Sequence, residues 1–64
     1  MPEVLNERQV SELFSLTIPF LRYARAERRG PRYLKIGKMV RYRRVDVEAF
    51  LAAHAVETSE RKRA

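Results

Sequence analysis

The chain has 64 residues, a formal net charge of +6 and a sequence pI near 10.5. This length makes one small domain that buries only about 60% of its unfolded surface. The absence of cysteine and the single histidine exclude a disulfide framework and a thiolate metal site. We expect no metal, cofactor or small-molecule ligand. No apolar run approaches the roughly 20 residues that span a bilayer, and no signal-peptide pattern follows Met1, so we expect neither a membrane partner nor export.

The basic residues are concentrated in the middle of the sequence. Residues 22–44 contain a single acid, Glu27, among these lysines and arginines: Arg22, Arg25, Arg28, Arg29, Arg32, Lys35, Lys38, Arg41, Arg43 and Arg44. Ordinary domains intersperse charges of both signs. This local excess is typical of proteins that contact nucleic-acid phosphates, although a well-solvated surface would also produce it.

The first predicted helix covers about residues 7–14. Asn6 is a good N-cap, and Gln9 stands three residues later, which is the spacing of a capping box. Apolar residues at helical spacing follow from Val10 onward. We expect residues 1–4 to be frayed.

A second helix is predicted to begin after Thr17 and to end by about Glu27. Thr17 is a good N-cap, and Pro19 is tolerated in a first turn. Arg22 and Arg25 then share one face, while the opposite side is apolar and ready for burial: Phe20, Leu21 and Ala24. Two helices joined by only Ser15 and Leu16 form a helix-turn-helix pattern.

A two-stranded hairpin is predicted after the helix-breaking pair Gly30-Pro31. The alternating segments 33–36 and 39–42 flank Gly37-Lys38, and Gly at the first central position favours a type II′ turn. We expect one face to carry Leu34, Ile36, Val40 and Tyr42, and the other to carry Tyr33, Lys35, Met39, Arg41 and Arg43.

The third predicted helix covers Val45–Ala55. It has acids in its first turn and an apolar stripe that ends at His54, which we expect to be a boundary residue. The basic segment 56–64 has no periodicity, and we expect a disordered tail. The prediction is therefore a mostly helical α+β domain over residues 1–55.

Four segments in this order resemble the small winged helix-turn-helix domains of phage excisionases and AlpA-like regulators, which are related to MerR-type activators. Residues 5–14 (LNERQVSELF) are similar to L-T-x-x-E-V-A-E-L-L, and residues 16–23 (LTIPFLRY) to V-S-x-x-T-L-R-x. Residues 30–43 (GPRYLKIGKMVRYR) resemble G-P-P-Y-x-K-L-G-x-x-V-R-Y-R, and residues 44–51 (RVDVEAFL) resemble R-x-E-D-V-E-A-W-L.

The chain departs from that pattern at three positions. Ser15 replaces the glycine of the turn, and Arg28 stands where a helix-ending glycine is common. Ala24 stands where the family usually has tryptophan, so the missing core volume must come from elsewhere, and Phe20 and Phe50 are the candidates.

The resemblance implies a DNA-binding protein that is not an enzyme and acts in the cytoplasm of a bacterial or phage-infected cell. In the excisionase branch, copies bind side by side along double-stranded DNA, bend it and direct a phage integrase toward excision. In the AlpA-like branch the protein regulates transcription. The chain lacks the long dimerisation helix of MerR-type proteins, so we expect a monomer that self-associates along DNA. A module that binds RNA or an acidic protein is a third reading of the same charge.

The candidate DNA contacts fall in two groups. In the second helix, which would enter the major groove, they are Thr17, Pro19, Arg22, Tyr23 and Arg25. The guanidinium of Arg22 can read a guanine edge, and the hydroxyl of Tyr23 can bind a phosphate. In the wing they are Lys35, Lys38, Arg41 and Arg43. The alternatives are a buried Tyr23, a solvated Arg25, and wing cations that protect a strand edge.

Overall fold

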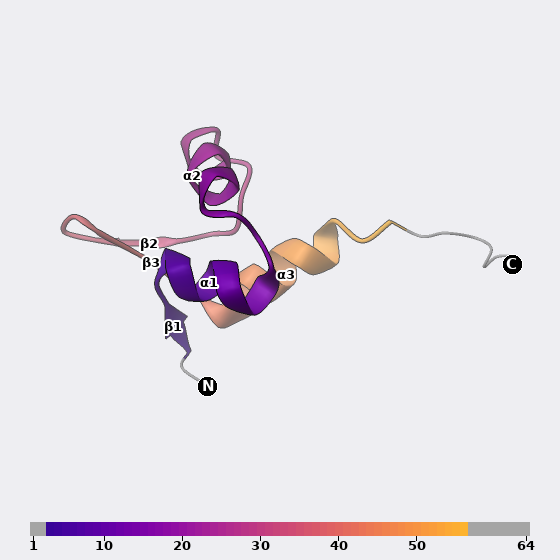
Figure 1. Ribbon diagram of the computed structural model, residues 1–64, viewed down its shortest axis with the longest axis horizontal. Helices are drawn as coiled ribbons and strands as arrows, with labels where there is room; N and C mark the ends of the chain where they lie inside the picture. Colours follow the sequence, from indigo (N-terminus) through magenta and orange to yellow (C-terminus); the bar gives the residue numbers. More distant parts are fainter. Residues whose placement is uncertain (1–2, 57–64) are drawn as a thin grey trace, which may run out of the picture.

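The computed structural model describes residues 3–56, and its architecture is α+β (Figure 1). The helices are α1 (Glu7–Phe14), α2 (Ile18–Ala26) and α3 (Arg44–Ala53). The strands are β1 (Val4–Leu5), β2 (Leu34–Ile36) and β3 (Met39–Arg43). They form an antiparallel sheet in the order β1-β3-β2. The predicted α+β class is confirmed. Residues 57–64 of the predicted tail 56–64 lie outside the described part.

The sheet has three strands, so the prediction of a two-stranded sheet was wrong. The third strand, β1, pairs with the base of β3 through Val4 with Arg43 and Leu5 with Tyr42. The amide of Arg44 donates to the carbonyl of Glu3 at 2.8 Å. Residues 3 and 4 are therefore not frayed. A strand of two residues is too short to show alternation, and only its pairing with a distant segment makes it a strand.

Both predicted N-caps are confirmed. The Gln9 amide donates to Asn6 Oδ1 at 2.8 Å and the Asn6 amide donates to Gln9 Oε1 at 2.9 Å, which completes the capping box of α1. The Phe20 amide donates to Thr17 Oγ1 at 3.2 Å, and Pro19 lies in the first turn of α2. These bonds satisfy amides that a helix start leaves without partners, and they set where α1 and α2 begin.

Both N-terminal helices end at a left-handed residue that is not glycine. Ser15 after α1 and Arg28 after α2 each have φ of 58°, and they are the only non-glycine residues in 3–56 with positive φ. At the end of α2, the Arg29 amide donates to the Ala24 carbonyl at 2.8 Å and the Arg28 amide to the Arg25 carbonyl at 3.2 Å. This is a Schellman motif, which usually has glycine at its left-handed position.

We predict that Arg28→Gly stabilises the protein by about 1 kcal/mol, because an L-residue is strained in the left-handed region and glycine is not. Urea unfolding followed by circular dichroism measures the change. Arg29→Gly is the matched control, since it also removes one exposed arginine but lies at negative φ. It should not stabilise. Equal effects of the two substitutions would show that charge, and not backbone strain, is responsible.

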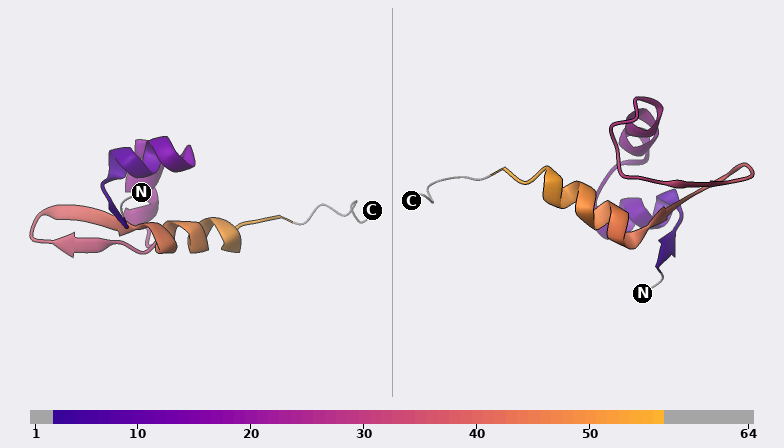
Figure 2. Two further views of the ribbon diagram at one scale, coloured as in Figure 1. Left: turned by 90° about the horizontal axis from the view of Figure 1, so that it is seen from below. Right: turned by 180° about the vertical axis from the view of Figure 1, so that it is seen from behind.

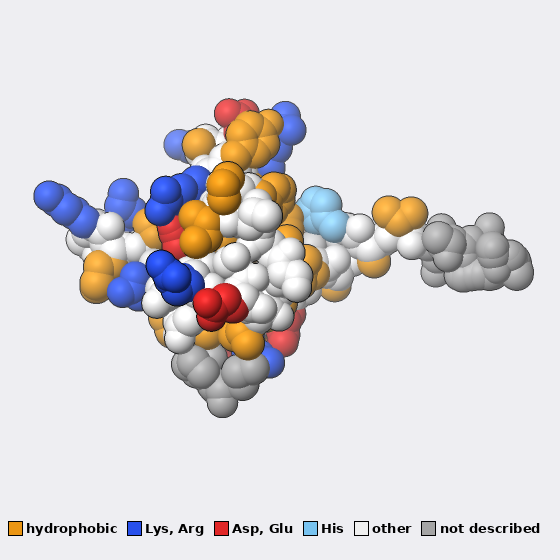
Figure 3. All heavy atoms as spheres, viewed as in Figure 1, with side chains coloured by type: hydrophobic (Ala, Val, Ile, Leu, Met, Phe, Trp, Pro, Cys, Tyr) orange, Lys and Arg blue, Asp and Glu red, His pale blue; other side chains and the backbone are white. Residues whose placement is uncertain are grey.

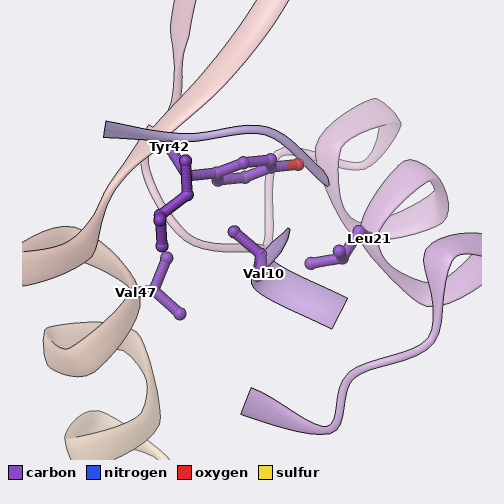
Figure 4. Close-up of a cluster of buried hydrophobic side chains, with 5 residues drawn as sticks. Val10, Leu21, Tyr42 and Val47 are labelled. Atoms are coloured by element: carbon purple, nitrogen blue, oxygen red, sulfur yellow. The ribbon is translucent and has the colours of Figure 1, made fainter. Parts of the chain in front are cut away.

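The core lies where the two N-terminal helices, the sheet and the start of α3 meet (Figure 4). It contains five side chains that are at most 1% exposed: Leu5, Val10, Leu21, Tyr42 and Val47. One comes from each of β1, α1, α2, β3 and α3. The core is small, and every element except β2 contributes one side chain to it.

The space beside Ala24 is filled by the chain itself. A Cβ atom built on Gly30 would lie 2.8 Å from the Cβ of Ala24. The loop after α2 therefore passes too close to the helix for a residue larger than glycine at position 30. Elsewhere, the rings of Phe20 and Phe50 lie with centroids 6.4 Å apart and connect α2 with α3. Neither ring belongs to the buried core, and Phe20 is 37% exposed, so the prediction that Phe20 and Phe50 supply the missing core volume was wrong.

The hairpin turn is as predicted, but the assignment of side chains to its two faces was wrong. Gly37 has φ of 61° and Lys38 does not have positive φ, as a type II′ turn requires. Ile36 is directly opposite Met39, and Leu34 is opposite Arg41. Residues opposite each other point to the same side of a sheet. The chain reverses within the two-residue turn, so even positions before it share a face with odd positions after it. Leu34 and Ile36 therefore lie with Met39 and Arg41, not with Val40 and Tyr42.

Helix α3 ends two residues before the predicted Val45–Ala55 boundary and begins one residue earlier. His54 follows its last turn, with Nδ1 2.9 Å from the Phe50 carbonyl and its ring 4.3 Å from the Phe50 ring. It is exposed at the helix end, as expected of a boundary residue. Within residues 3–56, no helix has the length and apolar character to cross a lipid bilayer.

Candidate nucleic-acid interface

A groove of about 370 Å³ lies between the helices and the hairpin. The helices contribute Asn6, Glu7, Arg22 and Arg25 to its lining, and the hairpin contributes Lys38, Met39, Val40 and Arg41. Figure 3 shows basic side chains gathered over the hairpin and around this region, with an acidic patch among them. Four of the eight lining residues are therefore cations, and these cations come from separate parts of the chain.

The acid in the groove, Glu7, holds Arg22 in place. Arg22 Nε donates to the two carboxylate oxygens of Glu7 at 3.2 and 3.0 Å, and Nη2 lies 3.0 Å from Oε2. The Glu7 side chain is 22% exposed and that of Arg22 is 65% exposed, so water still reaches the guanidinium. The hydrogen bond from Arg22 lowers the pKa of Glu7 below its ordinary value of 4.5, and the same bond raises the pKa of Arg22.

We predict that the contribution of this ion pair to stability is lost in acid. A carboxyl group whose pKa is lowered by folding stabilises the protein above its unfolded pKa, near 4.5, and stops doing so as the pH falls through the lower folded pKa. The difference in unfolding free energy between wild type and Glu7→Gln should therefore be larger at pH 7 than in acid. The difference should be small, because Arg22 is largely exposed.

A double-mutant cycle that adds Arg22→Gln isolates the pair, because Glu7 also interacts favourably with the N-terminus of α1. A coupling free energy that is the same at both pH values would contradict the prediction.

Arg25 is placed by Tyr42 of β3 and by Tyr33, which precedes β2, and it forms no salt bridge within residues 3–56. Its Nη1 donates to the hydroxyl of buried Tyr42 at 3.2 Å, and its Cζ lies 5.8 Å from the centroid of the Tyr33 ring. The Tyr33 and Tyr42 rings are themselves 6.4 Å apart. Arg25 is half-buried. It is thus a fixed cation at the inner end of the groove, with the hydrogen bond and the cation–π contact both limiting its motion.

Arg25 also lines a second hollow, which is formed with the loop after α2. Its remaining lining residues are Arg28, Gly30, Pro31, Arg32 and Tyr33. The sequence analysis did not place Arg28 and Arg32 among the site residues. Their charge was visible in the sequence, but the chain reversal at Gly30-Pro31 that brings them beside Arg25 was not.

The outward face of α2 is exposed along its length. Pro19, Arg22, Tyr23 and Ala26 stand at helical spacing and all are exposed. Tyr23 is 56% exposed, so it is a surface residue and not part of the core. Thr17 is exposed at the N-terminal end, where its hydroxyl caps the helix. The exposed side of α2 therefore carries the Arg22 guanidinium and the Tyr23 phenol, and Thr17 lies at the N-terminal end of the helix.

The four predicted hairpin cations do not lie together. Lys38 is exposed in the turn and Lys35 is exposed on the edge strand β2. Arg41 is half-buried, with Nη1 donating to the Val40 carbonyl at 2.8 Å. Arg43 lies at the junction with α3, where its Nε is 2.7 Å from Asp46 Oδ2, and this bond lowers the pKa of Asp46. Arg43 is not among the residues that line the groove.

Most cations of the basic segment form no salt bridge in the described part of the chain. Within residues 3–56, the salt bridges of this segment involve Arg22, Arg43 and Arg44 alone. Arg25 and Arg32 interact only at longer range with Glu7 and Asp46, respectively. The cations without a salt bridge are Arg25, Arg28, Arg29, Arg32, Lys35, Lys38 and Arg41. A surface of this kind attracts polyanions and releases their counterions on binding.

Glu7 lines the groove but was not predicted as a site residue. It stands fifteen positions from Arg22, and nothing local in the sequence connects the two. Compared with known proteins, the chain matches no family model, no curated protein and no solved structure.

Proposed function

We propose that this protein binds duplex DNA sequence-specifically, as a winged helix-turn-helix protein. In this proposal α2 enters the major groove, and the β2–β3 hairpin is the wing that contacts the backbone or the minor groove. The observation that carries the proposal is the basic groove between α2 and the hairpin, which joins Arg22 and Arg25 with Lys38 and Arg41 in one surface.

The arrangement of α1 and α2 supports this docking. The two helices are joined by a short turn at left-handed Ser15 and cross steeply, so that α2 is seen along its axis where α1 runs across the view (Figure 1). A helix-turn-helix has this form, with the second helix presented to DNA. The exposed face of α2 offers Arg22 for a base edge and the Tyr23 hydroxyl for a phosphate.

Within DNA-binding proteins, we propose a phage or prophage excisionase in the cytoplasm, with an integrase as its protein partner. The small domain, the hairpin and the strong positive charge support it. A gel-shift titration on attachment-site DNA with direct repeats should show successive cooperative complexes, a bent duplex and stimulated integrase-mediated excision. A single isolated complex without bending or stimulation would contradict this role.

The same surface would serve an AlpA-like transcriptional regulator. Promoter binding that changes transcription, with no effect on excision, would favour that role. Competition with RNA tests the third reading. A-form RNA has a deep, narrow major groove that α2 could not enter, so an RNA duplex of equal length should compete poorly. If it competes equally well, the proposed docking of α2 is wrong.

A further inference from the structure

Two apolar side chains face each other at the end of the hairpin. Ile36 and Met39 are a directly opposed pair on either side of the Gly37-Lys38 turn, and they point to the same side of the sheet. Ile36 is 52% exposed and Met39 is 48% exposed, whereas the core side chains are at most 1% exposed. The fold does not need this pair for its core.

The pair lies on a projecting arm. The end of the hairpin extends past the helices in every view of the ribbon (Figures 1 and 2). Strand β2 pairs with β3 and forms one edge of the sheet. The arm is thus a two-stranded ribbon that reaches away from the core and ends in two exposed apolar groups.

Cations flank this apolar pair along the arm. Lys38 forms the turn between the two residues, and Lys35, next to Ile36 in β2, points to the opposite face of the ribbon. Arg41 lies along the ribbon, with Nη2 3.5 Å from Met39 Sδ. Figure 3 shows orange and blue side chains side by side on this arm. The pair is therefore an apolar group in a positive field, which suits a partner with an anionic exterior and an apolar interior.

One member of the apolar pair, Met39, also lines the basic groove. Lys38, Met39 and Arg41 line that groove opposite Arg22 and Arg25. A duplex held in the groove would therefore meet the end of the hairpin. Stacked base pairs are apolar surfaces that lie between two rows of phosphates, and isoleucine and methionine are among the side chains that proteins insert between base steps from the minor groove.

We propose that Ile36 and Met39 form a wedge that inserts between base pairs from the minor groove and kinks the duplex, while Lys35, Lys38 and Arg41 hold the flanking phosphates. This inference rests on the proposed DNA binding. It adds a mechanism for bending and assigns it to two residues without charge.

The test compares wild type with Ile36→Thr/Met39→Gln, which removes apolar character, keeps β-branching at position 36 and chain length at position 39, and leaves the net charge unchanged. The DNA carries fluorophores at both ends to report bending and a 2-aminopurine base at the site to report unstacking. Wild type should raise both energy transfer and 2-aminopurine fluorescence at saturation. The double variant should lose both signals, yet its affinity should fall by less than about tenfold, because phosphate contacts supply most of the affinity.

Val45→Thr is the matched control, since Val45 is a branched apolar residue on α3 that is also exposed. It should bend DNA like wild type, and urea unfolding should show that all variants fold. If DNA saturated with the double variant is bent and unstacked as it is by wild type, the proposed wedge is wrong and DNA binding is unaffected. If the variant instead loses self-association and keeps both signals, the pair is a contact between copies and the wedge is wrong. A wild-type protein that does not bind duplex DNA would overturn the proposed function itself.

Discussion

Leu21→Ala is expected to destabilise the protein by about 2–5 kcal/mol, as for other buried leucine truncations. Leu21 is 1% exposed, and it is the largest side chain that α2 contributes to the core (Figure 4). A chain of this length has a total stability of roughly 3–10 kcal/mol. The loss therefore removes a large share of it, and the variant should be partly unfolded at room temperature. Urea denaturation followed by circular dichroism at 222 nm measures the change.

Tyr23→Ala is the control, because it removes a larger side chain from the exposed face of the same helix. It should change the unfolding free energy by no more than about 0.5 kcal/mol. If Tyr23→Ala and Leu21→Ala destabilise equally, α2 does not pack on the core through the face that the structure assigns to it.

Arg22→Ala is expected to reduce discrimination between the specific site and an unrelated duplex by about 1–3 kcal/mol, the contribution of one good bidentate base contact. Affinity for the unrelated duplex should change much less. The structure sharpens this prediction, because Arg22 is exposed on α2 and already held by Glu7 through its guanidinium. Quantitative gel shifts on both duplexes at one fixed salt concentration measure the two affinities.

Two matched variants separate base reading from charge. Arg22→Lys keeps the charge but not the planar fork, so it should lose discrimination like Arg22→Ala. Lys38→Ala, at the hairpin turn, should weaken binding to both duplexes alike and reduce the salt slope by about one. If Arg22→Lys discriminates like wild type, Arg22 contributes charge and does not read bases.

Glu7 gives the groove a built-in competitor for Arg22. The Glu7 carboxylate accepts hydrogen bonds from the guanidinium of Arg22, and a base edge or a phosphate would need the same donors. It orients the side chain and reduces the entropy that remains to be lost on binding. In the proposed DNA complex, Glu7 would also have to share or release Arg22. Glu7→Gln therefore alters the orientation of the Arg22 side chain as well as the charge of the groove.

The parts of the structure that were predicted correctly depend on contacts within a few residues. The Asn6–Gln9 capping box, the Thr17 cap and the Gly37-Lys38 turn each involve residues at most three apart. The two positions where glycine was expected but is absent, Ser15 and Arg28, are the two left-handed ends of helices. Backbone sterics and local hydrogen bonds act on the nearest residues alone, so a sequence reveals them directly.

The tertiary structure decided the remaining features, because each depends on segments that meet only after the chain has folded. Strand β1 exists through its pairing with β3, some forty residues away. Glu7 reaches Arg22 across fifteen residues, and Arg25 reaches Tyr42 across seventeen. The sequence by itself determined that the chain has helices, caps, a hairpin and a basic surface. Only packing determined that Arg22 is paired with Glu7, that Arg25 is held by tyrosine rings, and that other cations form no salt bridge in the described part.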